Sequence, residues 1–420
     1  MAWAVSSGQL FRQLEINRFT LTNGLRAVHA PLSGTAMAAV DVLYRVGSRF
    51  ENPELTGMAH LFEHLMFGGS ANVADFDMEL SRAGGTSNAW TSPDFTNFYN
   101  ILPACNLDTA LWLESDRMMA PALSGHSLEV QKQVVIEEFK ETCLNRPYGD
   151  MDHALQSLAY KTHPYRYPVI GKEFGHIEKV TEQDVRSWHD TYYTASNAVV
   201  CICGNVSFDQ ARQAVERWFG DMPLRPVPPE PTVREPLPEA PRYREMSGKV
   251  PQTVLTMAYP MAAYGEPGYY AADLISDILA NGQSSRFYRE LLLGTDLFTS
   301  VDASIQGNED PGLFLIQARL RHNGPAAEEA AIAAIGAQLD RMASERVEEH
   351  DLERCLNRIQ SNRTFSTMTP LPIALTAAMA EMHGEHPDAF MEPYRLITSE
   401  SLRASAATLF APCRRLTLVY

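Results

Sequence analysis

Two histidines and a glutamate fall within one pentapeptide, His60-Leu61-Phe62-Glu63-His64, in the stretch TGMAHLFEHLMFGGS. On a helix, residues at i and i+4 share a face, and the residue at i+3 lies beside them. Both imidazoles can therefore reach one metal ion, and Glu63 can point toward whatever else that ion binds. A zinc ion with three protein ligands and one open position lowers the pKa of a bound water to about 7. The spacing predicts a hydrolytic metal site; two unconnected histidines on an ordinary helix are the alternative.

A third ligand must come from elsewhere, and the helix predicted around VQKQVVIEEFKE offers several glutamates. Neighbouring glutamates on a helix point in different directions, so only one of Glu137 and Glu138 can face the metal. Val134, Val135 and Glu138 stand at i, i+1 and i+4, with Phe139 beside them. This pattern places Glu138 near the apolar side, where a buried carboxylate needs a partner such as a metal. A helix with an exposed acidic face and no metal is the alternative.

The composition of the 420-residue chain, with 45% apolar and 20% charged residues, is that of a globular protein with more than one core. The net charge of −16 argues against a nucleic-acid binder and would favour cationic partners such as basic peptides. No apolar run approaches the roughly 20 residues that cross a bilayer, and the N-terminus has no secretory signal pattern. We therefore expect a cytoplasmic protein, or a periplasmic one if a signal peptide was removed. Cys201 and Cys203, in the apolar run AVVCICGNV, are expected to be core thiols.

The proline-rich segment 223–241, PLRPVPPEPTVREPLPEAP, divides the chain near its middle. Its prolines forbid helix and favour an extended linker. We predict a zinc-binding catalytic half over 1–222 and a second, metal-free half over 242–420. The second half repeats the order of strands and helices of the first, but its helix GYYAADLISDILA, which corresponds to the histidine helix, has no histidine. The expected fold class is α+β, with helices packed in each half on a mixed, largely antiparallel sheet.

The motifs HLFEHLMFGGS, GGTSNAWTSPDFTNFYNILP and QVVIEEFKE together resemble the pitrilysin/insulysin family of zinc peptidases, which includes bacterial peptidases and the mitochondrial processing peptidase. The resemblance covers the first half well and the second half in outline. It implies that His60, His64 and Glu138 bind one zinc ion per chain. It also implies that Glu63 is the general base that acts on the zinc-bound water.

The same resemblance implies an endopeptidase that hydrolyses peptides or unfolded segments. The strand with Asn88 and Ala89, predicted over 86–103 and near a sheet edge because of Pro93, would bind the substrate by β-augmentation. Arg289 in the second half would reach across to that substrate. Chains of this length in the family usually pair, so a homodimer, or a heterodimer with a metal-free related subunit, is expected.

Two positions depart from the family pattern. A second glutamate is frequent seven residues before the metal-binding one, and this chain has Gln131 there. Catalytic members often carry a tyrosine seven to nine residues after the second-half arginine, and this chain has Phe298. A missing phenol would remove a donor to the tetrahedral intermediate. The competing hypothesis is therefore a non-catalytic structural or assembly subunit of the same architecture.

Overall fold

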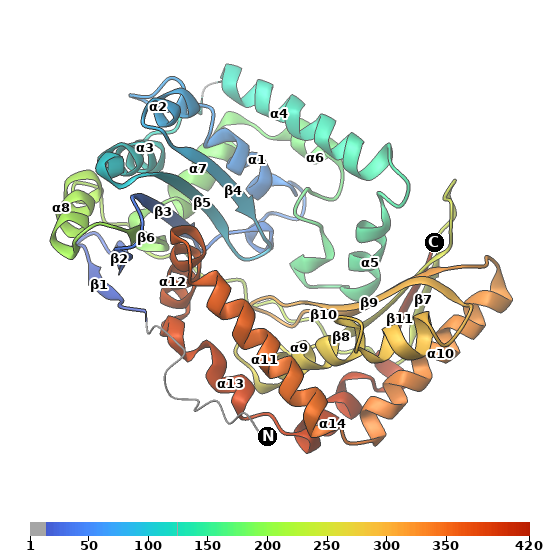
Figure 1. Cartoon of the computed structure of the whole chain (residues 1–420). Helices are drawn as coiled ribbons and strands as arrows, with labels where there is room; N and C mark the ends of the chain where they lie inside the picture. The colour runs from blue at the N-terminus through green and yellow to red at the C-terminus, as the bar shows by residue number, and fades with distance from the viewer. Residues whose placement is uncertain (1–13, 124) are drawn as a thin grey trace, which may run out of the picture.

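The computed structural model describes residues 14–123 and 125–420, and two β-sheets form its framework (Figure 1). The strands of the first sheet lie in the order β1 (Asn17–Thr20), β2 (Arg26–Pro31), β6 (Ala198–Gly204), β3 (Met37–Tyr44), β5 (Thr96–Pro103) and β4 (Thr86–Thr91). β2 and β6 run parallel, and the other neighbours are antiparallel. β4 is therefore an edge strand, with one row of backbone groups that no neighbouring strand of the sheet uses.

The second sheet has the same pairing pattern. Its strands lie in the order β7 (Arg242–Glu245), β11 (Leu416–Val419), β8 (Val254–Pro260), β10 (Leu313–Leu320) and β9 (Phe298–Gln306). β7 and β11 run parallel, as β2 and β6 do, and the remaining pairs are antiparallel. The prediction of an α+β protein with two similar halves is confirmed, and β9 takes the edge position that β4 has in the first sheet.

Helices cover both sheets, and none among the described residues is long and apolar enough to cross a membrane. The first half contains α1 (Met58–Leu65), α2 (Phe76–Arg82), α3 (Leu107–Met119), α4 (Gly125–Phe139), α5 (Met151–Ala159), α6 (Phe174–Lys179), α7 (Glu182–Tyr192) and α8 (Phe208–Phe219). The second contains α9 (Pro267–Ala280), α10 (Pro325–Ser344), α11 (Glu349–Ser366), α12 (Pro370–His383), α13 (Glu392–Arg395) and α14 (Ser399–Leu409). Two segments are π-helical: Lys140–Leu144 follows α4, and Phe287–Leu292 precedes β9.

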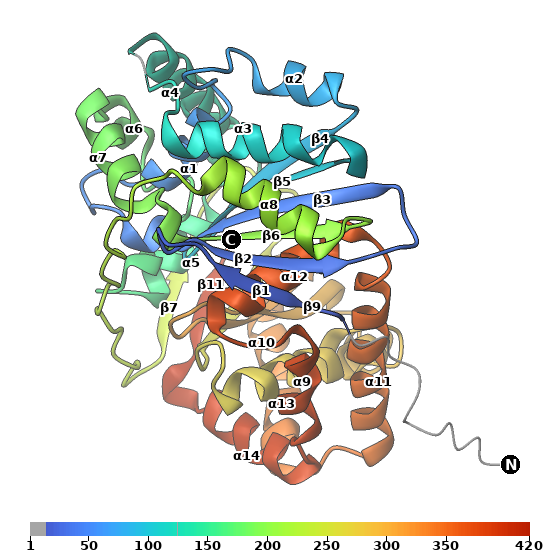
Figure 2. The same ribbon diagram turned by 90° about the vertical axis from the view of Figure 1, so that its left-hand side faces the viewer.

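Each half contributes one helix to the sheet of the other. α12 packs on the first sheet, where Ala374 and Ala377 meet Cys201 and Cys203, both core thiols as expected. Figure 2 shows α12 on the opposite side of this sheet from α8. α5 packs reciprocally on the second sheet, in a cluster of buried residues that includes Leu418. Each half therefore has a core of its own, and two further clusters combine residues of both halves.

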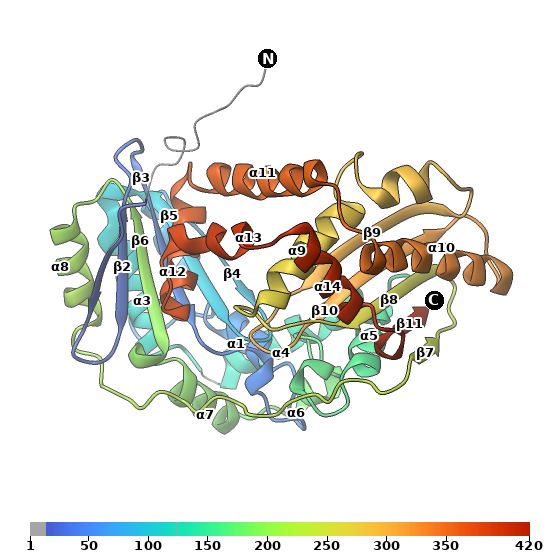
Figure 3. The ribbon, with the colours of Figure 1, turned by 90° about the horizontal axis from the view of Figure 1, so that it is seen from below.

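The proline-rich linker has no helix or strand over residues 223–241. It runs along one side of the molecule from α8 to β7 (Figure 3). Glu235 accepts hydrogen bonds from the backbone N–H groups of Lys161, Thr162 and His163, which fasten the linker to the end of α5. An extended, proline-rich segment has few backbone donors of its own, so such side-chain contacts fix its course.

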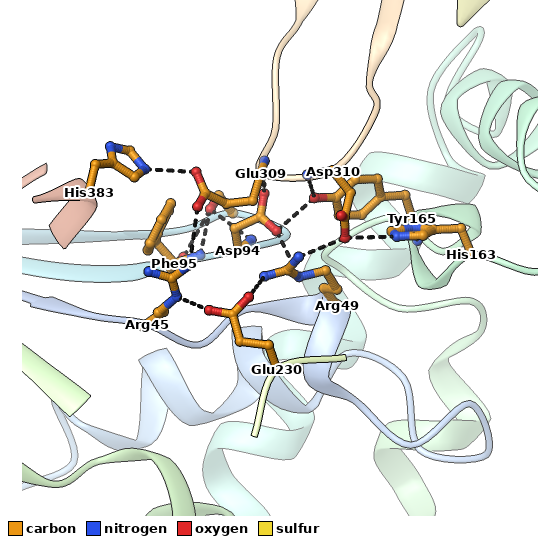
Figure 4. Close-up of polar contacts among 11 residues, drawn as sticks. Arg45, Arg49, Asp94, Phe95, His163, Tyr165, Glu230, Glu309, Asp310 and His383 are labelled. Atoms are coloured by element: carbon orange, nitrogen blue, oxygen red, sulfur yellow. Dashed lines mark hydrogen bonds and ion pairs between the residues drawn. The ribbon is translucent and has the colours of Figure 1, made fainter. Parts of the chain in front are cut away.

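A group of charged side chains around a buried Arg49–Asp94 pair joins the halves (Figure 4). We call this group, which also includes Glu230 and Asp310, the junction cluster. Arg49, which follows β3, contacts Asp94 at 3.0 Å, Asp310 at 2.7 Å and Glu230 of the linker at 3.3 Å. Tyr165 donates to Asp94 at 2.7 Å and accepts from the backbone N–H of Asp310. The side chains of Arg49 and Asp94 are 3% and 4% exposed, so each charge needs the other to offset its loss of hydration. The junction cluster thus ties the first half to the loop between β9 and β10.

Candidate metal centre

Helix α1 begins at a glycine and is held there by a distant carboxylate. Gly57 has φ 90°, a left-handed conformation that favours glycine, and no side chain of its own to cap the helix. Glu51, 8% exposed, accepts hydrogen bonds from the backbone N–H groups of Gly57 and Ala59, both at 2.8 Å. A carboxylate at this position satisfies orphan donors and complements the helix dipole. Glu51 therefore fixes the turn that carries His60.

The sequence of α1 separates a buried face from a functional one. Leu61, Phe62 and Leu65 are 0% exposed in the core of the first half. His60, Glu63 and His64 lie on the remaining face and are partly exposed. The imidazole rings of the two histidines stand 4.8 Å apart between centroids, at 88° to each other. Core packing on one face thus orients the histidines on the other.

The structure brings the two histidines to Glu138 on α4. Nε2 of His60 lies 3.7 Å from Oε2 of Glu138, and Nε2 of His64 lies 3.5 Å from the same oxygen. One ligand atom from each of the three residues can be chosen so that all lie within 4.8 Å of one another. Tetrahedral zinc with ligands at 2.0–2.2 Å holds its donor atoms roughly 3.3–3.6 Å apart. The three side chains therefore fit a zinc ion that keeps a further position open.

The protonation states of these groups also suit a metal. Burial lowers the pKa of His60, which favours the neutral imidazole that metals bind. The hydrogen bond with His64 lowers the pKa of Glu138, which favours the carboxylate. Nδ1 of His60 is buried and has no hydrogen-bond partner in the described part of the chain. The ring of His60 is consequently positioned by packing, with Nε2 free to act as a ligand.

The choice of Glu138 over its neighbours has a simple geometric reason. Glu137 is exposed and pairs with Lys140 at 2.7 Å, so it points away from the histidines. The prediction that Val134 helps to form the buried side of α4 is wrong, because Val134 is 45% exposed. Val135 and Phe139 are buried as predicted, together with Ile136, and Glu138 lies at the border of this side, with a side chain that is 40% exposed.

Glu63 lies beside the three ligand residues rather than among them. Its Oε2 accepts a hydrogen bond of 2.5 Å from the hydroxyl of Thr91, at the end of β4. Burial raises the pKa of Glu63, while the hydrogen bond from Thr91 and the proximity of His64 act in the opposite direction. A carboxylate with a raised pKa that stands next to a metal site is suited to accept and return a proton.

The predicted substrate residues Asn88 and Ala89 lie on β4, next to α1. The prediction of one strand over 86–103 is wrong in detail, because a turn at 92–95 divides the stretch into the hairpin β4–β5. Pro93 stands in that turn, where it lacks an N–H that a strand interior would need. The predicted edge position holds, with Asn88 opposite Tyr99 on the inner side and the outer side open.

The structure does not bring Arg289 into contact with the metal centre. Arg289 is exposed on the π-helical segment Phe287–Leu292, which packs on β9, α9 and α10. No hydrogen bond or ion pair within residues 14–123 and 125–420 joins its side chain to His60, Glu63 or His64. Phe298 is 0% exposed and belongs to the core of the second half.

Two features of the site were not predicted from the sequence: the role of Glu51, and the hydrogen bond from Thr91 to Glu63. Glu51 stands in a stretch, ENPELTG, that looks like a loop, and its role depends on the chain folding back onto α1. Thr91 reaches Glu63 only because β4 lies against α1. An acidic residue shortly before a helix that begins with glycine is the one local signal that could have indicated Glu51.

Two family models match successive parts of the chain. The family model described as insulinase, peptidase family M16, matches residues 27–173, and the model described as peptidase M16 inactive domain matches residues 179–359. The only candidate metal group among the described residues, His60, His64 and Glu138, lies within the first of these matches.

Related proteins are named as zinc proteases. The chain is 30% identical over 341 residues to "Zinc protease PqqE" of Helicobacter pylori, covering 80% of this chain and 76% of that protein. It is 27% identical to "Uncharacterized zinc protease YmxG" of Bacillus subtilis, covering 72% and 73%. A crystal structure of a protease from Helicobacter pylori superposes with a TM-score of 0.91 at 26% identity, over 97% of this chain and 99% of that one. A peptidase M16 inactive domain from Pseudomonas fluorescens, at 17% identity and a TM-score of 0.85 over 97% of both chains, shares the fold. By its sequence and its architecture, the chain belongs to the insulinase family of peptidases, family M16.

Proposed function

We propose that the protein is a zinc-dependent endopeptidase that hydrolyses peptides or unfolded segments. The observation that carries the proposal is the grouping of His60, His64 and Glu138 beside Glu63 on α1. These are the donors of a catalytic zinc site with an open position, together with a carboxylate placed outside the ligand set. The names of the related zinc proteases support the same conclusion.

Glu63, Thr91 and the open edge of β4 each have a separate role in the proposed hydrolysis. Zinc, when bound, supplies Lewis-acid polarisation of a carbonyl and lowers the pKa of a water molecule. Glu63 accepts the proton of the attacking water and later delivers it to the leaving amine. Thr91 holds the Glu63 carboxylate in one orientation through its hydroxyl. The open side of β4 would pair with an extended peptide alongside α1, with the Ala89 N–H exchanging the side-chain oxygen of Asn88, 2.9 Å away, for a peptide carbonyl.

Hydrolysis of a mixed library of unstructured peptides tests the proposal. The purified protein is expected to cleave the library, to lose activity with a zinc chelator, and to regain it when zinc is added back. Cleavage that chelation does not affect would contradict a metal mechanism. No cleavage by a folded, zinc-loaded protein would contradict the proposed enzyme.

A second candidate function is a non-catalytic subunit of the same architecture. Gln131 is partly exposed on α4, and Phe298 is a core residue, so these positions lack the carboxylate and the phenol that the family resemblance leads us to expect. A partner subunit, either another copy or a metal-free relative, would then supply or complete the activity. Sedimentation of the purified protein, followed by the peptide assay with any co-purified partner, separates the two candidates.

A further inference from the structure

A cavity of about 800 Å³ lies between the proline-rich linker and the second half, and we call it the linker cavity. Linker residues 233–238 form one wall, the end of α5 forms another, and α9, α14 and the loops after β8 and β9 form the rest. Its volume is within the range of roughly 300–1,000 Å³ that is typical of ligand sites. The residues that line it do not include the candidate metal ligands, so the linker cavity is distinct from the metal centre.

Most of the side chains around the linker cavity are apolar. Met261, Ile275 and Leu313 of the second half line it and are buried. Val233 and Leu237 line it from the linker and are 43% and 52% exposed. A hydrocarbon chain between the linker and the second half would remove the apolar surface of these residues from water. The linker cavity therefore favours a ligand with a sizeable hydrocarbon part.

The backbone around the linker cavity offers few hydrogen-bond donors. Four prolines line it, and proline has no N–H: Pro236, Pro238, Pro260 and Pro311. The hydroxyl of Tyr160 already donates to the backbone oxygen of Pro311, at 3.1 Å. A sugar, a nucleotide or an extended peptide would leave several polar groups without partners on such walls. A hydrocarbon chain has no polar groups that need partners.

Several charged residues that line the linker cavity already have partners. His163 lies 3.1 Å from Asp310, and Glu309 lies 2.8 Å from His383. Glu235 accepts the hydrogen bonds from three backbone N–H groups that fasten the linker. These groups therefore offer no unpaired charge to a ligand.

Two arginines of the linker cavity, Arg234 on the linker and Arg414 after α14, have no carboxylate partner. Arg414 donates from Nη1 to the backbone oxygen of Thr408 at 3.0 Å, and neither arginine forms an ion pair within the described part of the chain. Glu266, also on the wall, accepts from the backbone N–H of Ala263 at 3.1 Å, within its own loop. A single carboxylate on the ligand would give an arginine the bidentate partner that it lacks.

We propose that the linker cavity binds an aliphatic carboxylate, a medium-chain fatty acid. Its hydrocarbon chain would lie between Leu237 of the linker and the buried apolar wall of the second half, and its carboxylate would pair with Arg414. Arg234 is the second cation of the site. The proposal does not depend on peptidase activity, because the linker cavity shares no residue with the metal centre.

A ligand in the linker cavity would contact both halves of the protein. Tyr160 and His163 belong to the first half, and Leu313 and Leu409 belong to the second. A ligand that binds the folded chain and not the unfolded one raises the midpoint of thermal unfolding. The fatty acid should therefore stabilise the protein against heat.

Isothermal titration with decanoate, below the concentration at which it forms micelles, tests the proposal. A zinc chelator is present throughout, so that the carboxylate cannot bind at the metal centre. We expect one decanoate per chain, a rise in the unfolding temperature, and binding of 1-decanol that is about tenfold weaker, because the alcohol lacks the charge. Arg414→Gln should weaken decanoate binding about tenfold and leave 1-decanol binding unchanged.

Two exposed leucines of the linker give a matched pair of variants. Leu237→Asp places a negative charge in the linker cavity and should weaken decanoate binding by about tenfold or more. Leu224→Asp makes the same change outside the cavity, at a leucine that is 69% exposed, and should leave binding unchanged. No binding, equal affinities for decanoate and 1-decanol, or equal losses in Leu237→Asp and Leu224→Asp would overturn the proposal.

Discussion

Replacing Arg49 by methionine removes the cation at the centre of the junction cluster. Asp94 is buried, and burial raises its pKa to about 6 although Arg49 acts to lower it. In the variant, the Asp94 carboxylate keeps the hydrogen bond from Tyr165 but loses its charge partner. Removal of one partner of a buried ion pair costs about 3–5 kcal/mol of unfolding free energy, because the remaining charge stays out of water.

The pH dependence follows from the same geometry. The pKa of Asp94 in the folded variant must lie above its value in the wild-type protein, because the lowering effect of Arg49 is gone. A carboxyl whose folded pKa is raised contributes stability that is full at low pH and is lost as pH rises through the folded pKa. The deficit of Arg49→Met should therefore grow as the pH rises above about 6 and shrink as the pH falls toward 6.

Urea unfolding, followed by tryptophan fluorescence at pH 8.5 and pH 6, measures this deficit. Arg45→Met is the matched control, because Arg45 also pairs with Glu230 and lies 3.4 Å from Glu309, but its side chain is 28% exposed. The control should cost less than about 1 kcal/mol. Equal losses in Arg45→Met and Arg49→Met, or a deficit that does not change with pH, would refute the reasoning.

Three further variants test other parts of the structure. Glu51→Gln leaves one first-turn N–H of α1 without its carboxylate partner, so it should lower the free energy of unfolding by about 1–2 kcal/mol and weaken zinc binding. Chelator competition measures the zinc affinity, and an unchanged affinity would contradict the role of Glu51. Thr91→Val should lower kcat about tenfold with little change in zinc content, because Glu63 loses the donor that orients it; a normal kcat would count against that role. Asp41 is fully buried, and its burial raises its pKa to about 8, so its stabilising contribution is lost between about pH 4 and pH 8 as pH rises. Asp41→Asn should remove about 1.4 kcal/mol per pH unit from the slope of stability over that range, and an unchanged slope would contradict the assignment.

The metal ligands could be predicted because their spacing is local. His60, Glu63 and His64 share a face of one helix, so the sequence alone brings them together. Glu138 required a second helix, and its place was inferred from family resemblance and from the apolar pattern of α4. The pattern placed Val134 on the buried side, but Val134 is exposed, while Glu138 faces the histidines as predicted.

Contacts between residues that are far apart in the sequence could not be predicted in this way. α12 packs on the first sheet and α5 on the second, so contacts cross the boundary at the linker. Neither helix carries a local signal for which sheet it will cover, because an apolar helix face fits either. Glu51, Thr91 and the junction cluster likewise join residues that are distant in sequence.

Turnover at equal zinc occupancy tests the central claim most directly. The wild-type protein and Glu63→Gln would be loaded with zinc, their metal content matched, and their hydrolysis of the same peptide compared. Because Glu63 lies outside the ligand set, we expect one zinc ion per chain in both proteins and a loss of hydrolysis in the variant alone. Hydrolysis by Glu63→Gln at the wild-type rate, or no zinc retained by the wild-type protein, would contradict the account.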